Sequence, residues 1–132
     1  MNNKIFCFGD SLTAGTSPPS FQEHPYSSHL ESKLNSITSV EEEQQKNKYL
    51  VRHFGLPGWT ATQLSSPEGN LQSTLERINT STNTYPRLVI ILAGTNDLAY
   101  CTNSDECDDI FNSIKSIHDI CHERNIDTVA LR

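Results

Sequence analysis

The chain has 132 residues and a formal net charge of -6, from 10 Lys+Arg against 16 Asp+Glu. This acidity argues against a nucleic-acid partner, because phosphate contacts supply most non-specific affinity for nucleic acids. No apolar run approaches the roughly 18 residues of a membrane helix, and the N-terminal run is shorter than a signal-peptide core. We therefore expect one domain over residues 1–132, without a membrane span and located in the cytoplasm.

The four cysteines do not suggest a metal site, because no two of them form a Cys-x-x-Cys pair. We expect neither a metal nor a cofactor. Cys7 and Cys121 fall on apolar faces, where a thiol packs as a small hydrophobic group. Cys101 and Cys107 bracket a polar loop, and they can bridge in an oxidising compartment but stay free thiols in the cytosol.

The first half of the chain predicts two strands separated by a helix. The apolar run from Lys4 to Phe8 reads as a buried strand, followed by a loop in which Pro18 and Pro19 stop regular structure. Pro25 suits the start of a helix, whose apolar stripe is Tyr26, Leu30 and Leu34. The charged run from Glu41 to Lys48 is typical of a solvated segment, and a second strand is expected over Tyr49 to Phe54.

The second half continues the alternation of helices and strands. Leu71, Leu75 and Ile78 mark a helix, and the Thr/Asn/Ser run over 79–84 reads as a connection. The unbroken apolar run 88–92 predicts a strand covered on both faces. An amphipathic helix over 105–124 and a last strand over 126–131 follow. This order predicts an α/β fold with an open parallel sheet.

Polar residues follow three of the predicted strands. The three stretches are Gly9-Asp10-Ser11-Leu12, Gly55-Leu56-Pro57-Gly58 and Gly94-Thr95-Asn96-Asp97. In a parallel α/β sheet, ligands and catalytic groups collect outside the carboxyl ends of the strands. Each stretch is also explained by an ordinary turn, so their order and combination carry the signal.

In that order the three stretches resemble the blocks of the GDSL, or SGNH, hydrolase family. The resemblance implies a three-layer, flavodoxin-like α/β fold and a serine hydrolase that acts on a small-molecule carboxylic ester through an acyl-Ser11 intermediate. It also implies an oxyanion hole made by the backbone N–H groups of Ser11 and Gly58 and the side-chain amide of Asn96. Asp10 and Asp97 are expected to brace the loops by accepting backbone N–H bonds. Lipid esters, acyl thioesters, acetylated sugars and aryl esters all remain open as substrates.

The family's fourth element, an Asp-x-x-His pair near the C-terminus, has no clear counterpart. The sequence ends at Arg132, so we expect an SGNH hydrolase-type domain that is incomplete at its C-terminus and weakly active or inactive. Asp119 and His122 have the right spacing, but they precede the last strand and, with His118, read as solvated helix charge. The other histidines, His24, His29 and His53, have no better support, and only His24 lies in a loop that can approach the crevice.

Two further expectations concern partners. The alternative function is ligand binding: the chain is then a non-catalytic α/β module that binds an acyl, sugar or protein ligand in the same crevice. An Asp-x-x-His encoded beyond Arg132 favours the esterase, whereas a stop codon there favours the module. Val129 and Leu131 lie on a predicted edge strand, through which we expect the chain to self-associate.

Overall fold

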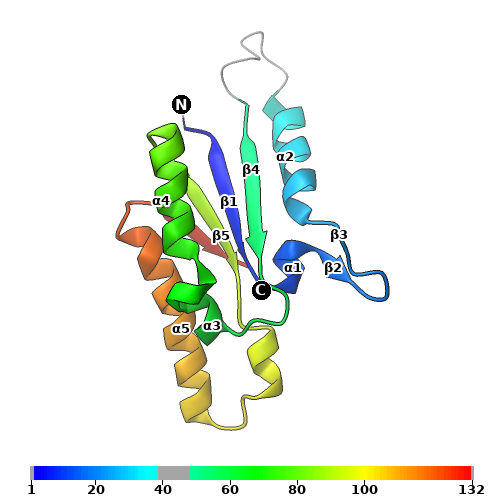
Figure 1. The fold of residues 1–132 in the computed structure, drawn as a ribbon, viewed down its shortest axis with the longest axis vertical. Coiled ribbons are helices and arrows are strands. Elements are labelled where there is room, and N and C mark those ends of the chain that lie inside the picture. Colours follow the sequence, from blue (N-terminus) through cyan, green and yellow to red (C-terminus); the bar gives the residue numbers. More distant parts are fainter. Residues whose placement is uncertain (1, 39–47, 132) are drawn as a thin grey trace.

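The computed structural model describes residues 2–38 and 48–131, and its centre is a four-stranded parallel sheet (Figure 1). The strand order is β4-β1-β5-β6. The strands are β1 (Lys4–Gly9), β4 (Leu50–Gly55), β5 (Leu88–Leu92) and β6 (Asp127–Ala130). The predicted open parallel α/β sheet is confirmed, and each predicted strand is present to within two residues at either end.

The register aligns the carboxyl ends of the three neighbouring strands β4, β1 and β5. Gly9 at the end of β1 pairs with Gly55 of β4 on one side and with Leu92 of β5 on the other. The loops that follow these residues therefore leave the sheet at one edge, called here the carboxyl edge. The opposite edge, where the strands begin, is called the amino edge.

Alternation along β1 divides the core between the two faces of the sheet. Phe6 and Phe8 pack with Leu64, Leu75 and Ile117 of the helices α3 (Ala61–Ser65), α4 (Leu71–Thr82) and α5 (Ser104–His122). Ile5 and Cys7 belong to a smaller cluster against α2 (Tyr26–Ile37), which includes the predicted stripe Tyr26, Leu30 and Leu34. Figure 1 shows these helices on opposite sides of the sheet, so the layers are helix, sheet and helix. Cys7 and Cys121 are both buried, as predicted.

Two stretches predicted as loops are partly regular. The 79–84 connection was predicted from its Thr, Asn and Ser content, but α4 runs to Thr82, and the hydroxyls of Thr80 and Thr82 donate to the carbonyls one turn earlier. The loop predicted after β1 contains the short helix α1 (Ser11–Ala14) and an antiparallel hairpin of β2 (Thr16–Ser17) and β3 (Gln22–Glu23). Residues 41–47 of the charged run lie outside the described residues.

Strand β6 lies at the edge of the sheet, and part of its surface is open. Val129 is 44% exposed and Leu131 is 39% exposed, although the Leu131 N–H donates to the Ile91 carbonyl at 2.8 Å. Self-association through this strand stays a prediction. Over residues 2–38 and 48–131, no helix is both long and apolar enough to cross a membrane.

Candidate functional site

Ser11 is the first residue of α1, two residues after Gly9 at the end of β1. Figure 1 shows α1 next to the carboxyl end of β1. Asp10 caps this helix, since its Oδ1 accepts the Leu12 N–H at 2.9 Å. Asp10 and Thr13 are buried, whereas Ser11 is half-buried. The local structure therefore anchors the turn through its neighbours and leaves the Ser11 side chain partly accessible.

Two glycines shape the loop that follows β4. A Cβ added to Gly55 would lie 2.2 Å from the Ala14 nitrogen, so only glycine lets α1 pack this closely on the end of β4. Gly58 has φ +80°, a left-handed conformation that favours glycine, and a Cβ there would meet no atom within 4 Å. The Gly58 backbone thus borders open space rather than packed protein.

Asn96 and Asp97 connect the loop after β5 to the loop after β4. The side-chain amide Nδ2 of Asn96 donates to the Trp59 carbonyl at 2.9 Å, and Oδ2 of Asp97 accepts the buried Ala61 N–H at 2.8 Å. The loop after β4 is joined in turn to β1, because the Leu56 N–H donates to the Gly9 carbonyl at 2.8 Å. Hydrogen bonds thus hold together the three loops that carry Ser11, Gly58 and Asn96.

The two aspartates act as predicted, each accepting a backbone N–H. Burial raises the pKa of the Asp10 carboxyl, and the bond from the Leu12 N–H partly opposes that shift. The nearby negative charge of Asp97 raises the pKa of Asp10 further. The carboxyl edge therefore has two acids used as loop supports.

The start of α3 was not predicted, although the sequence contains its signature. Thr60 and Gln63 form a capping box, in which the Thr60 side chain accepts the Gln63 N–H and the Gln63 side chain accepts the Thr60 N–H. This box begins α3 at Ala61, the residue whose N–H binds Asp97. The pattern Thr-x-x-Gln over residues 60–63, followed by Leu64, was the signal that could have located this helix.

The Asp119 and His122 pair does not form a dyad. The Asp119 carboxylate binds Lys115 Nζ at 2.6 Å, and His122 Nε2 lies 2.9 Å from the hydroxyl of Thr128. Thr128 is the second residue of β6, so the pair lies at the amino edge, away from Ser11. The prediction of solvated charge is wrong for His118, which is partly buried with Nδ1 2.7 Å from the same hydroxyl.

The remaining histidines, and the two cysteines of the predicted polar loop, lie elsewhere in the fold. His53 Nδ1 lies 2.9 Å from the Ser27 hydroxyl, and His29 is exposed on α2. The His24 N–H donates to the Gly15 carbonyl, which brings its backbone beside the end of α1. Cys101 and Cys107 form a disulfide, the first of the two alternatives left open by the sequence.

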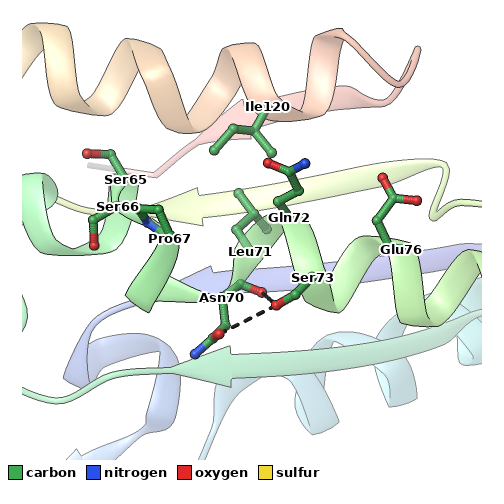
Figure 2. Close-up of a pocket in the computed structure, with 9 residues that line it drawn as sticks. All are labelled: Ser65, Ser66, Pro67, Asn70, Leu71, Gln72, Ser73, Glu76 and Ile120. Carbon is green, nitrogen blue, oxygen red and sulfur yellow. Dashed lines mark hydrogen bonds between the residues drawn. The ribbon is translucent and has the colours of Figure 1, made fainter.

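A pocket of about 390 Å³ lies elsewhere, between the segment 65–76 and α5 (Figure 2). Figure 2 shows Asn70, Leu71 and Glu76 on one side and Ile120 on the other. None of Ser11, Gly58 and Asn96 lines it. This pocket is therefore separate from the loops at the carboxyl edge.

The model of the GDSL-like lipase/acylhydrolase family matches residues 7–131, which include all three motif stretches. This chain belongs to that family. No curated protein sequence matches it.

Solved structures of several esterases share its fold. AlinE4, a SGNH-hydrolase family esterase, matches with a TM-score of 0.68 and 21% identity over 98% of this chain and 58% of that one. The acetyl xylan esterase AlAXEase matches with a TM-score of 0.65 and 18% identity, covering 96% of this chain and 56% of that one. Est24, a carbohydrate acetylesterase from Sinorhizobium meliloti, matches with a TM-score of 0.58 and 24% identity, covering 89% and 54%. The GDSL-like chain thus spans a little over half the length of these enzymes.

Proposed function

We propose that this chain provides the nucleophile and the oxyanion hole of a carboxylic-ester hydrolase, with Ser11 as the nucleophile. The observation that carries the proposal is the set of hydrogen bonds that joins the three motif loops at the carboxyl edge. Family membership supports the same reaction class. The bonds of Asn96 and Asp97 restrict how far the loop after β5 can move from the loop after β4.

In the proposed reaction, Ser11 Oγ attacks the ester carbonyl carbon and its proton passes to a base. The carbonyl oxygen becomes negative, the alcohol leaves with a proton, and water then releases the acid from acyl-Ser11. The Ser11 N–H belongs to the first turn of α1, where backbone donors have no partner within the helix. Asn96 uses one of its two amide hydrogens on Trp59, and the second remains for the substrate oxygen.

The general base is the component for which the described residues give no supported candidate. Asp119 and His122 are committed to Lys115 and Thr128 at the other edge of the sheet. Without a base, Ser11 has the weak nucleophilicity of an ordinary hydroxyl. In triad hydrolases lacking triad members, the oxyanion hole and binding still leave about 10³ to 10⁴ of acceleration over water. We therefore propose weak activity for the 132-residue chain.

A fluorophosphonate probe tests the proposal because it phosphonylates an activated serine hydroxyl. We expect slow labelling that peptide mapping assigns to Ser11, together with slow hydrolysis of p-nitrophenyl acetate. Ser11→Ala should remove both signals. Ser17→Ala is the matched control, since Ser17 is an exposed residue of the neighbouring strand β2. Equal labelling of Ser11→Ala, or hydrolysis that it leaves unchanged, contradicts Ser11 as the nucleophile. A wild-type chain that shows neither labelling nor hydrolysis favours the non-catalytic binding module.

A further inference from the structure

Two histidines of α5 converge on one atom of β6. His118 Nδ1 lies 2.7 Å from Thr128 Oγ1, and His122 Nε2 lies 2.9 Å from the same oxygen. The distance between His118 Nδ1 and His122 Nε2 therefore cannot exceed the sum of these two distances. The ring centroids are 6.1 Å apart.

Helix geometry explains why these rings meet. Residues four apart lie on the same face of a helix, so His118 and His122 project from consecutive turns of α5. Thr128 lies between Asp127 and the exposed Val129 on β6, and its side chain points toward the helix. The Thr128 hydroxyl has one proton, so it can donate to only one of the two imidazoles. The other imidazole must then donate its own N–H to the hydroxyl oxygen, or that contact is not a hydrogen bond.

From this convergence we infer that His118 and His122 form a chelating site for a divalent transition metal of the zinc, nickel and copper group. Imidazole nitrogen is a preferred ligand of these ions. With zinc–nitrogen bonds of about 2.0–2.1 Å and tetrahedral geometry, two imidazoles on one ion have ring centroids roughly 5 Å apart. The observed centroid separation of 6.1 Å is about 1 Å longer, so the two rings must both rotate and move closer together to bind a shared ion.

The surrounding residues set the character of this site. Over the described residues, no group of three or more His, Cys, Asp and Glu side chains is placed to hold a metal. Asp119 is bound to Lys115, and Cys121 is fully buried in the core. Two imidazoles thus supply the protein nitrogens, with water or the Thr128 hydroxyl completing the coordination shell. The resulting affinity is modest, and the site differs from the cysteine-based sites that the sequence excluded.

The site is independent of the proposed ester hydrolysis, because it lies at the amino edge of the sheet. An ion held by α5 beside Thr128 would fasten the end of the helix to the edge strand β6. Any ion that binds the folded chain more tightly than the unfolded chain stabilises the fold. Metal binding would therefore act on an edge strand that carries the exposed Val129.

The test is calorimetric titration of the untagged 132-residue chain with NiCl₂ and, separately, ZnCl₂ at pH 7.5. We expect one ion per chain, and a rise of roughly 5–10 °C in Tm at a hundredfold excess over Kd. His118→Gln and His122→Gln should each weaken binding at least about tenfold, because even indirect partners of a metal site typically contribute that much. The exposed His29 gives the matched control, and His29→Gln should bind as the wild type does.

Two outcomes overturn the inference: the wild type takes up neither ion, or His118→Gln and His122→Gln bind as tightly as His29→Gln. Far-UV circular dichroism without metal verifies that the variants are folded. Glutamine keeps a polar group beside Thr128, and His122 is exposed, so His122→Gln provides the reading even if His118→Gln is unstable. An unchanged Tm in saturating metal, with binding retained, contradicts the proposed fastening of β6.

Discussion

The two edges of the sheet use polar side chains in opposite ways. At the carboxyl edge, the buried carboxylates of Asp10 and Asp97 bind backbone N–H groups of neighbouring loops, while Ser11 and Gly58 border accessible space. At the amino edge, polar side chains bind one another, as in the contacts of His118 and His122 with Thr128. At the carboxyl edge, the carboxylates therefore hold the loops in place, and the Ser11 hydroxyl, which the proposed reaction needs, takes no part in this.

The largest effect is expected for Asn96, and it tests whether this residue contributes to catalysis in addition to linking the loops after β4 and β5. Asn96→Ala should lower kcat for p-nitrophenyl acetate by about 10² to 10³, the usual effect of losing one oxyanion donor. Removal of its bond to Trp59 should cost only about 1 kcal/mol of unfolding free energy. Initial rates and urea unfolding of the same variant separate the two roles. A variant with lowered stability but normal kcat makes Asn96 a structural residue only.

The next effect concerns Asp97, which is 5% exposed. Asp97→Ala leaves the buried Ala61 N–H without its acceptor and should lower the unfolding free energy by about 1–3 kcal/mol. Asp97→Asn keeps an acceptor oxygen and is the control, expected to recover much of that loss. Urea denaturation measures both. If Asp97→Ala and wild type have the same midpoint, this bond does not hold the loop after β4 in place.

At the amino edge, Glu76 joins α4 to two later segments of the chain. Its carboxylate accepts from the Tyr85 hydroxyl at 2.8 Å and from Arg124 Nε at 2.9 Å. The bond from Tyr85, then that from Arg124, lowers the pKa of Glu76 below its ordinary value of 4.5. Its stabilising contribution is therefore present above pH 4.5 and is lost as pH falls through the lower folded value.

Glu76→Gln should consequently reduce Tm at pH 7, and this reduction should become smaller as the pH falls below 4.5. The effect should be smaller than that of Asp97→Ala because the Glu76 side chain is 47% exposed. Thermal unfolding of both proteins across this pH range gives the comparison. A difference in Tm that is constant with pH attributes the change to packing and not to the carboxylate charge.

The smallest expected effect is that of the ion pair between Lys115 and Asp119. Both side chains are largely exposed, at 60% and 46%. Lys115→Gln should lower the unfolding free energy by no more than about 0.5 kcal/mol, and added salt should diminish the difference. A larger loss of unfolding free energy, measured by urea denaturation, would show that the ion pair between Lys115 and Asp119 also positions the end of α5.

Several parts of the site were predictable because their signals are local. The apolar run before Gly9 specified β1, and the run 88–92 specified a strand covered on both faces. The polar stretches at the strand ends indicated the family and the supporting roles of Asp10 and Asp97. Helix α3 was missed even though Thr60 and Gln63 carry a local signature, since five residues give too short an apolar pattern to recognise.

By itself, the sequence determined the alternation of strands and helices, the edge at which its three motifs lie, and the burial of Cys7 and Cys121. These properties depend on apolar periodicity and on the fixed direction of parallel strands. Only the tertiary structure decided that Asn96 binds Trp59, that Asp97 binds Ala61, and that His118 and His122 share Thr128. Such contacts join separate elements, and they depend on how helices pack on the sheet, which spacing within any one segment does not encode.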